Sequence, residues 1–143
     1  MLSSAHITYR TGGRVQAYLW IAIGSALGGM ARFWLSGVSA RLFGEALPWG
    51  TLLVNVTGSL IIGFFATFSG PGGRLDVDPA VRLFVMVGLC GGYTTFSAFS
   101  LQTLTLIQEG QWGLAGIYIA ASVVVCVLAV WVGHLLATQL SAL

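Results

Sequence analysis

The chain contains four long apolar stretches that carry very little charge, and this feature limits its fold more than any other. Charged residues make up only 7% of the sequence, against about 25% in a typical soluble domain. About 20 apolar residues are enough for a helix to cross a bilayer. We therefore predict an all-α integral membrane protein with a single domain over residues 1–143. Its four spans are expected at about 17–36, 51–69, 80–107 and 113–138.

Four spans place both termini on the same side of the membrane. That side carries Arg10, Arg14, Arg74 and Arg82, and the other carries Arg32 and Arg41. An excess of arginine on one side normally fixes orientation, but Asp76 and Asp78 accompany Arg74 and weaken the bias. The sequence is thus compatible with insertion in both orientations, and equally with a modest preference for one.

The third stretch is a poor helix at its centre. Gly88, Gly91 and Gly92 each cost about 1 kcal/mol relative to alanine in a helix interior, and a run of hydroxyl-bearing side chains follows them. Such glycines can also serve close helix packing. Loosened backbone survives in hydrocarbon only where protein, a cavity or an ion satisfies its polar groups. We therefore predict a functional break in this helix at about residues 88–95.

Several classes of function are disfavoured by what the spans lack. No carboxylate lies inside a span, so no acid is placed to bind protons or cationic drugs. No catalytic triad and no phosphate-binding glycine loop with a lysine is present, which argues against an enzyme. A net charge of +2 gives no footprint for nucleic acid. Cys90 and Cys126 lie in apolar segments, and we interpret them as small buried residues.

Neutral polar residues remain as candidates. Thr51, Asn55 and Ser59 repeat every four residues and share one helical face. Asn55 is either a hydrogen bond between helices or a ligand, because an unpaired amide is costly in a membrane. Tyr118 and Ser122 show the same spacing on the fourth span. On periodicity alone these two are better explained by an interfacial tyrosine and a helix-bonded serine.

Phe96 and Phe99 follow the predicted break and point to nearly the same side of the helix. Such a pair is most often packing, but an aromatic ring also has an electropositive edge. Ser100 and Thr103 are expected to continue a polar track beyond the two rings. Amide and hydroxyl donors with ring edges and no fixed charge suit a small anion better than a cation.

Three motifs resemble those of the Fluc/CrcB family of fluoride channels. They are GGYTTFSAFS at 91–100, GTLLVNVTG at 50–58 and GGMAR at 28–32. The motifs occur in the family's order, and the resemblance covers essentially the whole chain. It implies a passive channel that exports fluoride across the cell inner membrane and relieves its toxicity. It also implies an antiparallel, dual-topology homodimer with two pores along the dimer interface.

The resemblance further implies roles for individual residues. The expected fluoride path contains Asn55, Phe96, Phe99, Tyr118, Ser122 and Thr51. The backbone carbonyls of Gly91 and Thr94 are expected to hold a central structural sodium ion, and Arg32 matches a vestibule position. Ala98 departs from the pattern, because family members usually have Thr or Ser between the two phenylalanines.

Two other functions compete with the channel hypothesis. A small four-span drug or cation transporter would share the size and dual topology, but it would want a membrane-embedded Glu in the first span, and none is present there. A non-transporting assembly subunit would use every polar residue for helix association.

Overall fold

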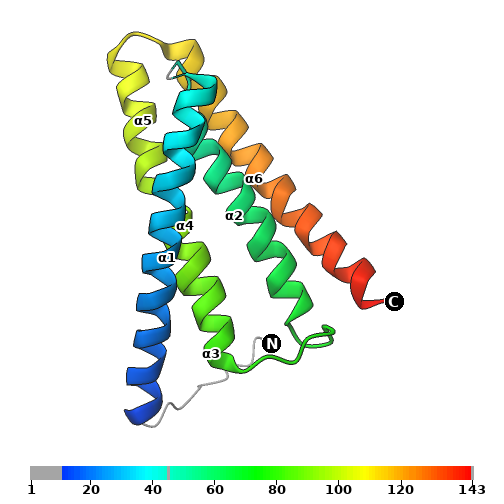
Figure 1. The fold of residues 1–143 in the computed structure, drawn as a ribbon. Helices are drawn as coiled ribbons and strands as arrows, with labels where there is room; N and C mark the ends of the chain where they lie inside the picture. The colour runs from blue at the N-terminus through cyan, green and yellow to red at the C-terminus, as the bar shows by residue number, and fades with distance from the viewer. Residues whose placement is uncertain (1–10, 45, 143) are drawn as a thin grey trace, which may run out of the picture.

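The computed structural model describes residues 11–44 and 46–142, with side chains from residue 13 onward. Arg10 and Glu45 lie outside the described residues. The helices are α1 (Thr11–Phe43), α2 (Trp49–Phe68), α3 (Pro79–Arg82), the π-helix η1 (Leu83–Cys90), α4 (Gly91–Tyr93), α5 (Phe96–Gln108) and α6 (Trp112–Ser141) (Figure 1). The short elements from α3 to α5 form one span, Pro79–Gln108, and all 4 spans are long and apolar enough to cross a membrane. The all-helical, four-span prediction is confirmed.

Local chemistry sets the ends of these helices. The first helix continues beyond the predicted residue 36 to Phe43, because Gly44 is the residue that leaves the helix, with φ of 74°. The Gly44 N–H still donates to the Ala40 carbonyl at 3.0 Å, as at a glycine C-cap. The third span starts where the Asp78 carboxylate accepts from the Ala80 N–H at 2.7 Å, with Pro79 in the first turn.

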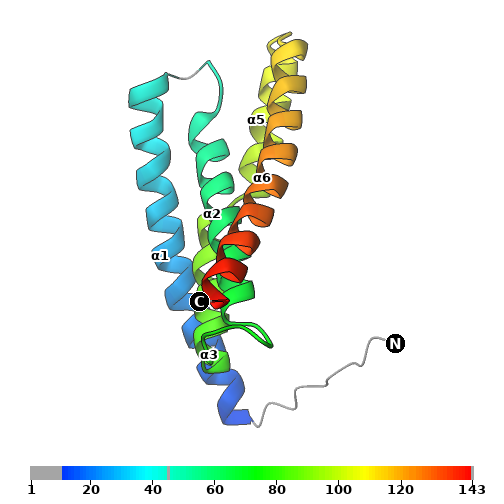
Figure 2. The same cartoon turned by 90° about the vertical axis from the view of Figure 1, so that its right-hand side faces the viewer.

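The four spans run up and down and pair in two ways. One pair consists of α1 with η1 and α4, and the other of α2 with α6, which lie side by side in both ribbon views (Figures 1 and 2). The α1–α2 connection and the α5–α6 turn lie at one end of the molecule (Figure 1). The start of α1, α3 and the end of α6 lie at the other, so the first and last described residues share one end.

Glycines bring the paired helices into backbone contact. A Cβ added to Gly88 would lie 3.0 Å from the Gly24 Cα, and one added to Gly92 would lie 2.7 Å from the Ser25 Cα. On the other pair, a Cβ on Gly133 would lie 2.8 Å from the Phe64 nitrogen. These glycines are therefore used for close approach of helices, the packing pattern common between membrane helices.

The centre of the third span differs from the predicted break at 88–95. Residues 88–90 belong to the π-helix η1 and residues 91–93 form α4, and Gly88 and Gly92 pack against α1. Only Thr94 and Thr95 are extended, with φ/ψ of −80°/159° and −154°/119°. The residues that leave the helix are thus two threonines, whose branched side chains favour extended backbone.

This packing makes Gly28 intolerant of a side chain. A Cβ there would collide with the Leu89 carbonyl and lie 2.7 Å from the Tyr93 nitrogen. We expect Gly28→Ala to lower the free energy of unfolding by about 1–3 kcal/mol, as overpacking does, measured by thermal or denaturant unfolding in detergent. The neighbouring Gly29→Ala is the control, because its Cβ has nothing within 4 Å. Equal stability of the two variants would contradict the packing described here.

Candidate functional site

Asn55 on α2 forms two hydrogen bonds with the extended residue Thr95. Its Nδ2 donates to the Thr95 carbonyl at 3.0 Å, and its Oδ1 accepts from the Thr95 N–H at 2.7 Å. The side-chain amide thus pairs with the backbone as a neighbouring strand would. This pairing fixes the orientation of the Asn55 amide. It uses only one of the two N–H groups of Nδ2, so the second N–H remains available as a donor. Asn55 also lines a cavity.

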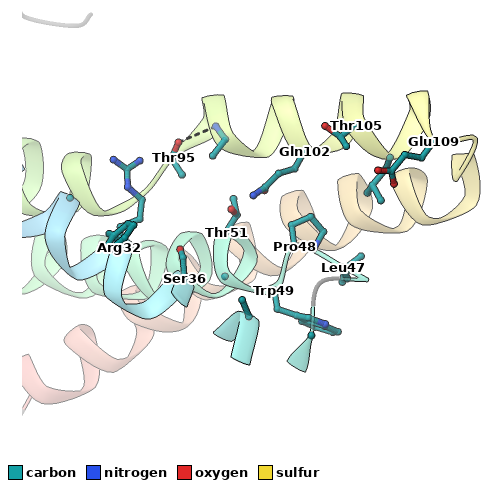
Figure 3. Close-up of a pocket in the computed structure, with 17 residues that line it drawn as sticks. Arg32, Ser36, Leu47, Pro48, Trp49, Thr51, Thr95, Gln102, Thr105 and Glu109 are labelled. Carbon is teal, nitrogen blue, oxygen red and sulfur yellow. Dashed lines mark hydrogen bonds between the residues drawn. The ribbon is translucent and has the colours of Figure 1, made fainter. Parts of the chain in front are cut away.

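The same pairing redirects the hydrogen bonds around the interruption. In a continuous α-helix the Thr95 N–H would donate to the Gly91 carbonyl, and the Ala98 N–H to the Thr94 carbonyl. Here the Thr95 N–H goes to Asn55, and the Ala98 N–H goes to the Thr95 hydroxyl at 3.2 Å (dashed in Figure 3). The carbonyls of Gly91 and Thr94 have therefore lost their helical donors. These are the two carbonyls that the family resemblance singles out.

A cavity of about 390 Å³ lies at this interruption, between α2, the third span and α6. Six of the predicted site residues line it: Asn55, Gly91, Thr94, Phe96, Phe99 and Ser122. The Ser122 hydroxyl is buried and has no hydrogen-bond partner among the described residues. Together with the spare Asn55 N–H, it gives the cavity two uncommitted neutral donors. No residue that lines this cavity carries a formal charge.

Aromatic rings form a continuous row beside these donors. The ring centroids of Phe96 and Phe99 are 5.3 Å apart, and those of Phe99 and Tyr118 are also 5.3 Å apart, with tilted planes in both pairs. Phe99 and Tyr118 are buried, whereas Phe96 is 77% exposed. The Tyr118 hydroxyl donates to the Gln102 Oε1 at 2.9 Å. The row therefore runs from the surface of the chain, through two buried rings, to the partly buried amide of Gln102.

A second pocket, of about 720 Å³, opens on the α1 side of the interruption. Two further predicted site residues, Arg32 and Thr51, line this second pocket (Figure 3). Gln102 from α5 and Thr51 from α2 point toward one another across it (Figure 3). Because the Gln102 Oε1 accepts from Tyr118, its NH₂ group is left to face the pocket. Thr95 lines both pockets and separates them.

The expected polar track through Ser100 and Thr103 is wrong. Both hydroxyls bond back to their own helix, to the Phe96 carbonyl at 2.9 Å and the Phe99 carbonyl at 2.8 Å. Sequence reasoning also missed Thr95 and Gln102. The available signal for Gln102 was its position three residues after Phe99, which puts both on one helical face.

Comparison of the sequence with known proteins places this chain in a family. The family model described as "CrcB-like protein, Camphor Resistance (CrcB)" matches residues 19–134. The chain belongs to this family. All nine predicted site residues lie within the matched region.

Relatives in the CrcB family cover most of the chain. A protein of Methylocella silvestris is 58% identical over 87% of this chain and 95% of its own length. One of Opitutus terrae is 56% identical over 88% of this chain and 96% of its own length. One of Rhodospirillum rubrum is 56% identical over 82% of this chain and 91% of its own length. Each of these relatives is called a fluoride-specific ion channel.

The Asn55 pairing predicts a stability effect that can be measured. We expect Asn55→Leu to lower the free energy of unfolding by about 1–3 kcal/mol, because the Thr95 N–H and carbonyl lose their partner. Unfolding in detergent, followed by circular dichroism, measures the change. Ser59→Ala is the control: it lies on the same face of α2 and lines the same cavity. A loss in Asn55→Leu no larger than in Ser59→Ala would contradict the pairing.

Proposed function

We propose that this chain is a fluoride-selective channel that passively exports fluoride and relieves its toxicity. The observation that carries the proposal is the cavity at Thr95, where uncommitted donors of Asn55 and Ser122 meet the rings of Phe96 and Phe99 with no formal charge. Neutral donors and ring edges favour an anion. The names of the 53–58% identical relatives support fluoride as that anion.

The alternatives receive less support. A drug or cation transporter needs a charged or acidic group in its binding site, and none of the residues lining the cavity supplies one. An assembly subunit would have its polar groups paired with each other, whereas the Ser122 hydroxyl is buried and finds no partner in the part of the chain that the structure describes. Membership in a family whose relatives are called ion channels also argues against an enzyme.

We infer a passage from the α1-side pocket to the cavity. Arg32 attracts anions into the larger pocket, where Thr51 and the Gln102 amide offer donors. Tyr118 holds Gln102 in the orientation that presents its NH₂ group. The ion then passes Thr95 and reaches Asn55, Ser122 and the edges of the two phenylalanine rings. A path built this way gives an anion several weak contacts and no strong trap, as conduction requires.

The protein is proposed to act as an antiparallel, dual-topology homodimer in the inner membrane. Phe96 is 77% exposed, and Gly91, whose carbonyl has lost its helical donor, lies exposed near it. A backbone carbonyl facing lipid would cost several kcal/mol. A second copy covering this face removes that cost and closes the open side of the cavity. The weak arginine bias between the two ends allows the two copies to insert in opposite orientations.

The proposed dimer would hold a structural sodium ion at its centre. Hard cations such as sodium prefer oxygen ligands, and unwound backbone in a membrane is a known source of them. The carbonyls of Gly91 and Thr94 fit this role, because their helical donors are engaged elsewhere. Two carbonyls from each copy would surround one cation. The ion would supply positive charge that holds the two interruptions together.

Fluoride flux tests the proposed function directly. Purified protein in liposomes loaded with fluoride should release it passively, as recorded by a fluoride electrode. We expect Phe96→Ile and Phe99→Ile to lower the rate at least about tenfold, equivalent to about 1.4 kcal/mol, because the ring edges are lost while the apolar bulk remains. Phe84→Ile is the control, since Phe84 lies in the same span but packs on Trp20 with centroids 6.0 Å apart.

The flux assay has two outcomes against the proposal. Absence of fluoride release by the folded wild-type protein would exclude the channel. Equal rates for the three isoleucine variants would exclude the two rings from the path. Dimer formation, checked by size-exclusion chromatography, ensures that the variants compared are assembled.

The sodium site predicts that stability depends on the cation present. Replacing sodium by N-methylglucamine should lower the melting temperature of the dimer, because an ion that binds only to the assembled dimer stabilises the dimer by mass action. Thr94→Val should keep this dependence, since the ligand is the backbone carbonyl and not the side chain. Identical melting curves with and without sodium would contradict the site.

A further inference from the structure

Gly58 on α2 lies directly against the interruption of the third span. It is buried, and it lines the cavity of about 390 Å³ together with Asn55, Thr94 and Thr95. A Cβ added to Gly58 would collide with the Thr94 Cγ2 and would lie 3.1 Å from the Tyr93 Cδ1. The chain therefore has no room for a side chain at this position of α2.

The Thr94 side chain is held in one orientation against Gly58. Its hydroxyl donates to the Cys90 carbonyl at 2.9 Å, and its backbone N–H donates to the same carbonyl, also at 2.9 Å. A β-branched side chain is restricted at χ1, so a hydrogen bond that fixes the Oγ1 also fixes the direction of the Cγ2. Turning the methyl away from Gly58 would break the hydroxyl's bond. The methyl thus has a set position against the backbone of α2.

Tyr93, the residue before Thr94, is tied to the same stretch of α2. The Thr57 hydroxyl donates its one hydrogen to the Leu53 carbonyl at 2.7 Å. It therefore accepts from the Tyr93 hydroxyl, with 2.8 Å between the two oxygens. This bond keeps the Tyr93 ring beside Gly58, so the ring has little freedom to make room for a larger residue there.

The close approach at Gly58 is next to the pairing of Asn55 with Thr95. Asn55 lies three residues before Gly58 and therefore on the same side of α2. Its amide reaches the Thr95 N–H at 2.7 Å and the Thr95 carbonyl at 3.0 Å. Such bonds tolerate little lengthening, because N–H···O distances in proteins lie at about 2.7–3.2 Å. A side chain wedged between Gly58 and Thr94 would move α2 away and stretch this pairing.

We propose that Gly58 is a positioning residue for the Asn55–Thr95 pairing and, through it, for ion conduction. Its bare backbone lets α2 come close enough for Asn55 to pair with Thr95. That pairing directs the Asn55 amide and releases the carbonyls of Gly91 and Thr94 from helical bonding. The link to conduction rests on the proposed channel function. Gly58 acts through Asn55 and contacts no ion itself.

A double-mutant cycle between positions 58 and 94 tests this role. Gly58→Ala is made in the wild type and in a Thr94→Ser background, which keeps the hydroxyl and lacks the methyl that collides. Passive fluoride flux per folded chain is measured in liposomes, and exchange of the Thr95 amide is measured in detergent. In the wild type we expect Gly58→Ala to slow flux and to accelerate exchange, each at least about tenfold. In the Thr94→Ser background the same change should alter each rate by less than about threefold.

Gly63→Ala is the matched control on α2. Its Cβ would collide with the backbone of Val130 on α6, so removing the Thr94 methyl gives it no relief. We expect Gly63→Ala to have the same effect on flux and on exchange in both backgrounds, which separates a general loss of helix packing from the specific role of Gly58.

Several outcomes would overturn the proposal. Equal effects of Gly58→Ala in the two backgrounds would do so, and so would wild-type flux in this variant despite faster exchange at Thr95. If Gly58→Ala alone gives no folded protein, the double variant must fold, and failure of both would overturn the proposal as well. Absence of flux from the folded wild type would contradict the channel function instead, and the exchange rates would then still decide whether Gly58 positions the pairing.

Discussion

Two hydrogen bonds between the Asn55 amide and the peptide groups of Thr95 take the place of helical pairing inside the third span. An extended residue in a membrane helix leaves an N–H and a carbonyl without partners, at a cost of several kcal/mol each in lipid. A side-chain amide has both a donor and an acceptor in one plane, so it can satisfy both groups at once. The interruption depends on this one residue of α2.

The rest of the site follows from that exchange of partners. Because the Thr95 N–H is taken by Asn55 and the Ala98 N–H by the Thr95 hydroxyl, the carbonyls of Gly91 and Thr94 become available. The turn that follows places Phe96 and Phe99 next to the same cavity. The carbonyls of the proposed cation site and the rings of the proposed anion path thus both depend on one local change in hydrogen bonding.

Sequence reasoning predicted the spans well, because hydropathy alone determines where a helix can cross a bilayer. It placed the helix break too broadly, because glycine propensity does not reveal that Gly88 and Gly92 pack against α1. Asn55, Phe96, Phe99 and Ser122 line one cavity, and their role in a fluoride path stays a prediction. Thr95 was missed because its role depends on a partner 40 residues away, which no local pattern indicates. Gln102 was missed because its spacing from Phe99 does not reveal the hydrogen bond with Tyr118, 16 residues away.

Amide hydrogen exchange at Thr95 tests the central claim, that Asn55 holds the interruption in place. In the wild-type protein the Thr95 amide is expected to exchange slowly, because it is buried and donates to the Asn55 Oδ1 at 2.7 Å. In Asn55→Leu, exchange at this amide should accelerate at least about tenfold, while the amides in the middle of α6 keep their rates. Unchanged protection of Thr95 in the variant would contradict the account.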